Sequence, residues 1–385
     1  MRILFVSPGI LYSEQRRFED AGSESVIYGL SKEMVKRGHE VYIVGRFGNF
    51  GGAEYKVIED IQFINIKIPN LHDEIAYEIG SALAYSRKAV SRILEISPDV
   101  ISLNERFSAY FPSKLNIPKT FTTHVPEAMG FFKQFAVKSH VLNHLLVPFK
   151  KVIEERVMRR SDIIIALNRT IEDYLHTRGF TNTCPIPNAI DVKKYENKGE
   201  DNFVLYAGGF RKVKGVNFLI EAFAKIGDKY DTNLQLIGSG PEEEKLKKLV
   251  RAKKLEHRVH FMPLVRKTEL RERYLAKCSV FVLPSLFECM PVTLLEAMAS
   301  GKPVIAGDIP GPTDIITQGY DGFLFEKGNI DELKEYLELH LSDGKLRKII
   351  GKNARKTVEE KYTFEKVADH YLKLYEEVLL SKSNQ

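Results

Sequence analysis

Two glutamates eight positions apart, Glu288 and Glu296, are the residues of this sequence best placed to do chemistry. An apolar strand pattern ends near Leu283, a loop carries Glu288, and a helix is predicted to begin near Pro291. Helical side chains lean toward the helix N-terminus, so Glu296 could reach a ligand above the first turn, where N–H groups attract phosphate. Two acids beside such a site suit a sugar nucleotide. The alternative is that Glu296 pairs with a neighbour and Glu288 is solvated.

A glycine loop supplies the second candidate, in the segment Tyr206-Ala-Gly-Gly-Phe-Arg-Lys-Val-Lys-Gly. Gly208 and Gly209 let the backbone approach a pyrophosphate, and Lys214 at the end of the loop can neutralise the charge of a leaving group. For Arg211 and Lys212, phosphate binding and a solvated loop position remain equal alternatives.

Other common signatures of cofactor and metal chemistry are missing from the sequence. It contains no GxxxxGK[ST] loop, no GxGxxG after the first strand, no Asp-x-Asp pair and no HExxH motif. The three cysteines, Cys184, Cys278 and Cys289, lack the spacing of a zinc site or a disulfide scaffold. We therefore expect no resident metal or cofactor and a reducing, cytoplasmic location.

Strand and helix patterns alternate twice along the chain, which predicts parallel α/β structure in two domains. In the first half we expect a hairpin near residues 55–66 and helices over Ser23–Arg37 and Asp73–Ile96. The pattern restarts after Pro187-Asn188 with strands near Phe203–Tyr206 and Val280–Leu283, and a final amphipathic helix covers Phe364–Leu380. The predicted strands of the first half are Ile3–Val6, Glu40–Val44, Val100–Leu103, Thr120–Thr122, Ile163–Ala166 and Cys184–Ile186.

Composition limits the class of protein. The 385 residues fit two or three domains, and 44% hydrophobic with 28% charged residues is typical of a soluble protein. The sequence shows no run of about 20 apolar residues and no signal-peptide pattern at its start. The net charge of +6 is spread along the chain, which argues against a nucleic-acid-binding face.

The Glu-x7-Glu segment resembles the signature of family 4 retaining glycosyltransferases, the group 1 glycosyltransferases of the GT-B fold, and the resemblance extends over nearly the whole chain. It implies two doubly wound Rossmann-like domains facing across a cleft, with the C-terminal helix packing back on the first domain. The implied parts are an acceptor-side domain over residues 1–187, a nucleotide-sugar-binding domain over 188–363, and a helix and tail over 364–385.

The resemblance also assigns roles around the acid pair. Glu288 is implied to lie against the hydroxyls of the donor sugar, and Glu296 to hold the ribose hydroxyls. The backbone at Cys289 and Met290, just before Pro291, is implied to contact sugar and phosphate. Cys289 stands where family members often have glycine, and a small side chain retains the amide.

Further family positions are matched in part. Lys214 matches the Lys of a Lys-Gly pair that binds the donor phosphates, whereas the family's arginine falls on Gly209, so Arg211 becomes the candidate substitute. His124, at the end of Lys-Thr-Phe-Thr-Thr-His, is implied to lie at the reacting end of the sugar. Gly22 resembles the second glycine of a pair near the donor phosphate.

The loop that contains Met262 and Leu264 resembles the one whose main chain reads the donor base, so UDP-, GDP- and ADP-sugars are not separated by sequence. The implied activity is a metal-independent hexosyltransferase (EC 2.4 class), which moves a hexosyl unit to the hydroxyl of a glycan, a lipid-linked acceptor or a small molecule. Glu288, His124 and Lys214 are its catalytic candidates. A sugar-nucleotide epimerase and a non-catalytic sugar-nucleotide-binding protein are the alternatives.

Residues 131–160 are basic and rich in apolar side chains. A helix of this kind can lie on an anionic bilayer, at the inner face of the membrane. It can equally be a helix that covers the sheet and presents a solvated basic face. The sequence leaves both interpretations open.

Overall fold

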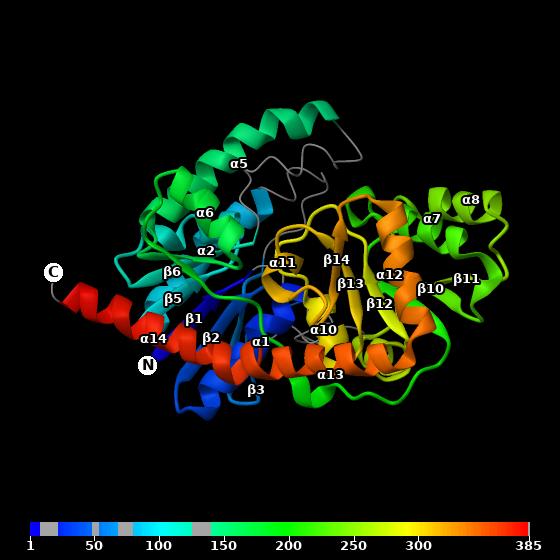
Figure 1. Ribbon diagram of the computed structural model, residues 1–385. Helices are drawn as coiled ribbons and strands as arrows, with labels where there is room; N and C mark the ends of the chain where they lie inside the picture. Colours follow the sequence, from blue (N-terminus) through cyan, green and yellow to red (C-terminus); the bar gives the residue numbers. More distant parts are fainter. Residues whose placement is uncertain (8–21, 48–53, 68–79, 125–139, 384–385) are drawn as a thin grey trace. The chain divides into compact units, whose positions relative to one another are not determined.

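The computed structural model describes residues 1–385 apart from 8–21, 48–53, 68–79, 125–139 and 384–385. The described chain forms two compact units, each built around one sheet (Figure 1). Of the described residues, those up to Ala189 and those from Phe364 onward form the first unit, and Ile190–Thr363 form the second. The predicted α/β class with two parallel-sheet domains is confirmed.

The first unit has an eight-stranded sheet in the order β3-β4-β2-β1-β5-β6-β7-β8. Neighbouring strands are parallel except for the pair β3 and β4, which forms the predicted hairpin. The strands are β1 (Arg2–Val6), β2 (Glu40–Gly45), β3 (Tyr55–Ile58), β4 (Ile61–Asn65), β5 (Val100–Leu103), β6 (Lys119–Thr123), β7 (Ile163–Ala166) and β8 (Thr183–Pro185). The helices are α1 (Gly22–Lys36), α2 (Ser81–Ile96), α3 (Arg106–Ala109), η3 (Pro112–Lys114), α5 (His140–Arg160), α6 (Arg169–Thr177) and α14 (Phe364–Ser383).

The second unit has a six-stranded sheet in the order β11-β10-β9-β12-β13-β14, with every neighbouring pair parallel. The strands are β9 (Phe203–Ala207), β10 (Asn233–Ile237), β11 (Val259–Met262), β12 (Val280–Leu283), β13 (Val304–Asp308) and β14 (Phe323–Glu326). The helices are η5 (Val192–Lys194), η6 (Lys212–Lys214), α7 (Val216–Ile226), η7 (Gly227–Lys229), α8 (Glu243–Ala252), α9 (Lys267–Glu269), η8 (Leu270–Leu275), α10 (Val292–Ala299), α11 (Pro312–Ile315), α12 (Ile330–Ser342) and α13 (Gly344–Lys361).

The central strands of the second sheet, β9 and β12, are buried along their whole length. Helical crossovers cover both faces of a parallel sheet, so such strands read as continuous apolar runs rather than alternating ones. The chain runs outward in one direction from β9 through β10 to β11, and in the other from β12 through β13 to β14. The carboxyl ends of β9 and β12 therefore flank the point where strand order reverses, which is where ligands of doubly wound sheets bind.

The C-terminal helix α14 packs on the first unit, as predicted, and lies beside α1 (Figure 1). Arg37, just after α1, pairs with Asp369 and donates to the carbonyl of Glu365 at 2.7 Å. Phe364 packs so closely on α1 that a Cβ at Gly29 would lie 2.0 Å from its ring. Burial of Tyr371 and Tyr375 against the unit completes the contact.

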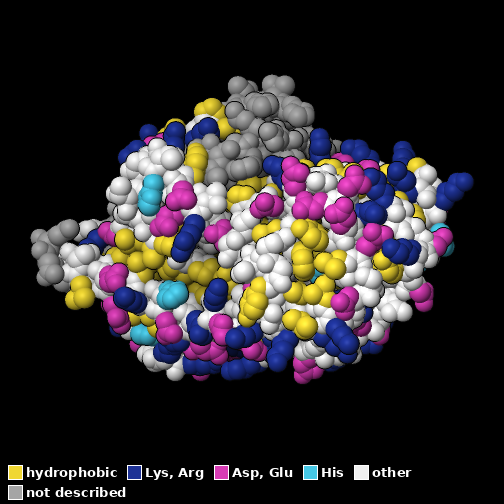
Figure 2. Space-filling view, viewed as in Figure 1, with side chains coloured by type: hydrophobic (Ala, Val, Ile, Leu, Met, Phe, Trp, Pro, Cys, Tyr) yellow, Lys and Arg dark blue, Asp and Glu magenta, His cyan; other side chains and the backbone are white. Residues whose placement is uncertain are grey.

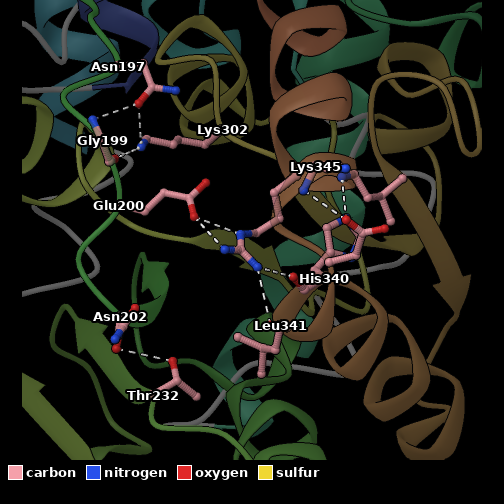
Figure 3. A network of polar contacts seen from close by, with 12 residues as sticks. Asn197, Gly199, Glu200, Asn202, Thr232, Lys302, His340, Leu341 and Lys345 are labelled. Atoms are coloured by element: carbon pink, nitrogen blue, oxygen red, sulfur yellow. Dashed lines mark hydrogen bonds and ion pairs between the residues drawn. The ribbon is translucent and has the colours of Figure 1, made fainter.

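The two ends of the second unit are held together. The amide of Ile190 donates to the carbonyl of Tyr362 at 2.8 Å, and Ile190 pairs with Thr363 in a parallel bridge. The segment that follows, Tyr195–Glu200, is fixed to the unit by polar side chains, which Figure 3 shows around Lys302. Most of residues 187–200 therefore belongs to the second folded unit.

The helices differ in regularity and in how much of them is described. Between β11 and β12 the chain forms a short α-turn, α9, continued by the π-helical η8. Helix α8 begins at Glu243, after a turn at residues 241–242. Of the helix expected from Asp73, the structure describes Ser81–Ile96, and the basic segment 131–160 is described only as α5.

On the face drawn in Figure 2, basic and acidic side chains are interspersed rather than segregated. Among the described helices, none combines the length and apolar character needed to cross a bilayer.

Candidate active site

The loops that follow β9 and β12 lie against each other. The amide of Leu286 donates to the carbonyl of Val213 at 2.8 Å, so the two backbones are joined directly. Gly215 has φ +62°, and a Cβ there would lie 2.0 Å from the carbonyl oxygen of Pro284. Only glycine combines this left-handed backbone with this approach. The topological switch therefore brings together the two loops that carry the candidate residues.

Glu288 is a buried acid and not a solvated one, with 9% of its surface exposed. Its Oε1 accepts from Lys214 Nζ at 2.6 Å and from Ser285 Oγ at 2.7 Å. Sequence had assigned Lys214 to phosphate and Glu288 to sugar; the structure places the two side chains in one ion pair. An ammonium can donate to an anionic group and the adjacent carboxylate can accept from hydroxyls, so the pair suits a ligand in which a charged group and hydroxyls are close together.

The glycine loop before Lys214 is held by Tyr206. Its hydroxyl donates to the carbonyl of Gly209 at 3.0 Å, and burial, together with the charge of Glu288, raises the pKa of this phenol. The amide of Gly208 donates to Ile237 at 3.0 Å. A Cβ at Gly209 would meet its nearest neighbours at 3.9 Å, so a side chain fits there and sterics do not explain the missing arginine. Arg211 is exposed on the same loop.

Glu296 lies in α10 with 2% of its surface exposed. Its Oε1 accepts from Lys267 Nζ at 2.8 Å and from the hydroxyl of Tyr195 at 3.2 Å. Its Oε2 is buried and has no hydrogen-bond partner among the described residues. Glu296 therefore does pair with neighbours, which was the alternative to ligand binding, but both of these neighbours meet Oε1. A buried carboxylate oxygen without a donor costs free energy, so a ligand hydroxyl here would be favourable.

Cys289, Met290 and Pro291 form the approach to α10, which begins at Val292. Their path is fixed by Gly311, which has φ +93° and whose Cβ would lie 2.4 Å from the carbonyl oxygen of Cys289. Burial raises the pKa of the Cys289 thiol, and the neighbouring Glu288 carboxylate adds to the shift. The Cys289 side chain is therefore a neutral thiol at physiological pH.

Met262 and Leu264 are placed differently. Met262 ends β11, and its carbonyl accepts from the amide of Gly238 at 3.2 Å. Leu264 is 64% exposed in the following loop. Their assignment to the donor base stays a prediction.

His124 and Gly22 belong to the first unit. His124 follows β6 directly, where burial and the nearby Arg106 guanidinium lower the pKa of the imidazole to about 4. The ring is therefore neutral at physiological pH. Gly22 is the exposed first residue of α1, and the loop before it lies outside the described residues.

Three residues that sequence reasoning missed touch the acids, namely Ser285, Tyr195 and Lys267. Ser285 lies three positions before Glu288 and could have been found as a near neighbour. Tyr195 and Lys267 stand in segments that carry no recognised motif, and only tertiary packing brings them to Glu296. Within the described parts of the chain, no group of three or more His, Cys, Asp or Glu side chains could hold a metal ion.

Comparisons with known proteins give the same picture over both units. Residues 188–357 match the family model of group 1 glycosyl transferases, and residues 21–194 match that of glycosyltransferase family 4. The chain is 33% identical to an N-acetyl-α-D-glucosaminyl L-malate synthase of Bacillus anthracis over 94% of its own length and 96% of the relative's.

Solved structures agree on the fold. A sucrose-phosphate synthase of Thermosynechococcus elongatus superposes with a TM-score of 0.83 at 19% identity, covering 99% of both chains. The Anabaena protein HepE in complex with UDP and glucose superposes with a TM-score of 0.73 at 17% identity, covering 97% of this chain and 98% of the other.

Proposed function

Because this chain belongs to the group 1 glycosyltransferases of the GT-B fold, we propose that it is a retaining hexosyltransferase that uses a nucleotide sugar. The observation that carries the proposal is the environment of the two acids. Glu288 and Glu296 are both buried at the carboxyl edge of one sheet, and Oε2 of Glu296 meets no donor in the described part of the chain. That arrangement suits a ligand with a sugar at one end and a ribose at the other.

Donor binding divides among three groups. Glu296 Oε2 accepts from a ribose hydroxyl. Lys214 and the glycine loop Gly208–Gly209 face the diphosphate, and Arg211 supplies a second cation. Glu288 accepts from hydroxyls of the transferred sugar, with Ser285 fixing its orientation. The backbone at Cys289, Met290 and Pro291 adds contacts to sugar and phosphate, while Met262 and Leu264 stand beside the base.

The reaction breaks the bond between the anomeric carbon and the diphosphate oxygen and forms a bond from that carbon to the acceptor hydroxyl. The acceptor's proton passes to the departing diphosphate. Lys214 stabilises the charge that develops on the leaving group. Glu288 holds the sugar as positive charge develops at its anomeric carbon. Attack on the same face as departure gives a product with the donor's anomeric configuration.

His124 and Gly22 are the proposed donor-side residues of the first unit, His124 for the transferred sugar and Gly22 for the donor phosphate. A neutral imidazole offers one N–H donor and one acceptor nitrogen, so His124 suits a hydrogen bond to a sugar hydroxyl better than neutralisation of phosphate.

The transfer proceeds without a metal cofactor. The positive charge that a divalent cation supplies to a diphosphate comes here from Lys214 and Arg211. EDTA is accordingly expected to leave the rate unchanged.

The acceptor carries a hydroxyl, and the protein works in the cytoplasm, in keeping with a sequence of only three cysteines. The name of the Bacillus anthracis relative joins N-acetylglucosamine to L-malate, so both belong in the first substrate panel. UDP-sugars come first, because the Anabaena structure holds UDP and glucose.

The helix α5 offers a membrane contact. Phe149 and Val152 are 43% and 45% exposed, and Arg156 and Arg159 are exposed one and two turns further along. An apolar and basic stripe of this kind binds anionic headgroups. Co-sedimentation with anionic but not neutral vesicles is expected; equal sedimentation with both would reject the contact.

The activity is tested in two steps. A thermal-shift screen against UDP, GDP, ADP and their sugars identifies the donor, because a ligand of the native state raises the melting temperature. Transfer is then followed with hydroxyl acceptors, and NMR of the anomeric proton reports the configuration of the product.

Each outcome separates the candidate functions. Acceptor-dependent transfer with retention supports the proposal. Conversion of the donor sugar without acceptor indicates an epimerase, and binding without any turnover indicates a non-catalytic binding protein. An inverted product would refute the retaining mechanism.

A further inference from the structure

The carboxylate of Glu296 is used asymmetrically. Both of its described donors, Lys267 Nζ and the Tyr195 hydroxyl, meet the same oxygen, Oε1. The other oxygen, Oε2, is buried without a partner among the described residues. A lysine close to a buried acid normally serves to satisfy it; here the pairing holds the acid in place through Oε1 and leaves Oε2 without a donor among the described residues.

Lys267 also links two parts of the predicted nucleotide site. Its backbone begins α9, directly after the loop that follows β11, and its side chain reaches α10. The ion pair therefore fixes the distance between the loop assigned to the base and the acid assigned to the ribose. A binding site whose parts are already fixed loses less conformational entropy when its ligand binds, so this ion pair favours nucleoside binding.

Tyr195 is the second residue that donates to Oε1 of Glu296. Burial raises the pKa of its phenol, and the carboxylate of Glu296 raises it further, so the hydroxyl stays protonated and donates. The Arg271 guanidinium lies 5.9 Å from the centre of the Tyr195 ring. Arg355 holds the backbone by donating to the carbonyls of Tyr195 and Ala299 at 2.6 and 2.7 Å.

We propose that Lys267 is a positioning residue that, with Tyr195, orients Glu296 so that its free oxygen selects a nucleotide with a ribose over one with a deoxyribose. This inference rests on the proposed function. Lys267 acts through the carboxylate; the discriminating contact itself is made by Glu296.

The test compares ribo- and 2′-deoxynucleoside diphosphates. Dissociation constants are measured by calorimetry for UDP, GDP and ADP and for their 2′-deoxy forms, with wild type, Lys267→Met, Lys267→Arg and Tyr195→Phe. Lys277→Met is the matched control, because Lys277 pairs with Asp201 at 3.2 Å on the surface of the same unit.

We expect wild type to prefer the ribonucleotide by about tenfold, as one hydrogen bond to a charged group allows. Lys267→Met should lose most of that preference by weakening the ribo form alone. Lys267→Arg should restore it, Tyr195→Phe should reduce it by about two- to threefold, and Lys277→Met should leave it unchanged. For the Lys267 and Tyr195 variants, kcat at saturating donor should stay within about threefold of wild type. The reason is that the ribose contact stabilises the bound donor and the transition state equally.

A double variant guards against misfolding. Lys267→Met leaves a buried acid without its counter-charge, which destabilises proteins, whereas Lys267→Met combined with Glu296→Gln removes both charges. If Lys267 acts through Glu296, the lysine substitution has no further effect on the preference in the Gln background.

Three results would overturn the inference. They are an unchanged ribose preference in Lys267→Met, an equal loss for both sugar forms, and a wild type that binds nucleotides without preference. The last result leaves the proposed function standing. A wild type that binds no nucleoside diphosphate would reject the proposed function and this inference together.

Discussion

Two polar clusters of the second unit, one around the buried Glu296 and one around the buried Lys302, share one segment of chain and differ in how completely their charged groups are paired. Tyr195 extends to Glu296, while Asn197, Gly199 and Glu200 a few residues on join the network around Lys302 and Arg347 (Figure 3). The first cluster leaves Oε2 of a buried carboxylate without a partner among the described residues. In the second cluster, Lys302 has acceptors for its charge and Arg347 is paired with Glu200.

In the network of Figure 3, Lys302 is 1% exposed and its Nζ donates to Asn197 Oδ1 at 2.9 Å and to the carbonyl of Gly199. Arg347 places Nε and Nη2 on Glu200 at 2.9 and 2.7 Å, and Nη1 on the carbonyl of His340. Burial lowers the pKa of Lys302, and the nearby carboxylates of Glu200 and Asp201 oppose that shift.

The difference teaches how to tell a structural charge from a functional one. A fully paired buried network stabilises one conformation and offers nothing to a ligand. A buried carboxylate oxygen without a donor is a loss that folding alone does not explain, and it points to a ligand. His340 Nε2 also lacks a partner among the described residues, but it belongs to a neutral ring packed edge-on against Phe323, where the loss is smaller.

The comparison predicts first that Glu288→Ala abolishes most catalysis while leaving the fold intact. We expect kcat to fall by roughly 10²–10³-fold, as for loss of a group that stabilises the transition state, with the donor dissociation constant little changed. Steady-state transfer assays and calorimetry measure the two effects. Glu256→Ala, an exposed acid of the same unit, is the control. Near-normal transfer would remove Glu288 from the site.

The second prediction concerns the stability of the second unit at low pH and depends on the buried His340. Burial lowers the pKa of His340 from its ordinary 6.5 to about 4. Below pH 6.5 His340 binds a proton in the unfolded chain but stays neutral in the folded one. The free energy of unfolding therefore decreases as the pH is lowered, by about 3 kcal/mol at pH 4 relative to neutral pH.

Urea unfolding between pH 7 and 4 tests this with His340→Leu, which should lose that part of the pH dependence. His260→Gln, exposed on β11, is the control and should keep it. Identical slopes for His340→Leu and wild type would contradict the assignment.

The third prediction separates stability from binding. Lys302→Met removes the donor to Asn197 and Gly199 and should lower the free energy of unfolding by about 2 kcal/mol, partly offset by relief of a buried charge. Donor affinity should stay within about twofold of wild type. Lys345→Met, whose side chain is exposed, is the control. A large loss of donor affinity in the folded Lys302 variant would make the network part of the site.

The fourth prediction applies to Glu296. Glu296→Ala should weaken donor binding by about 10- to 100-fold, the range for hydrogen bonds to a charged acceptor. Turnover at saturating donor should change far less than in Glu288→Ala. Lys267 is partly exposed and can be hydrated once its partner is removed. Equal losses of kcat in Glu288→Ala and Glu296→Ala would contradict the assignment of Glu288 to the transferred sugar and Glu296 to the ribose.

Much of this architecture was predictable from local pattern. Buried parallel strands read as short apolar runs, and β9, β12 and β7 appear where Phe203–Tyr206, Val280–Leu283 and Ile163–Ala166 predicted them. Gly215 follows η6 and marks the turn into α7 because its backbone is left-handed. The acid pair could be identified because its spacing lies within one strand–loop–helix segment.

What the sequence determined by itself is therefore the two-sheet fold, the group 1 glycosyltransferase family, and the candidates Glu288, Glu296 and Lys214. Tertiary structure alone decided the pairing of Lys214 with Glu288, separated by 74 positions, and the meeting of Tyr195, Lys267 and Glu296. The physical reason is that sequence periodicity encodes which face of an element is buried, whereas the partner of a buried charge depends on which loops the strand order brings to the same edge of a sheet.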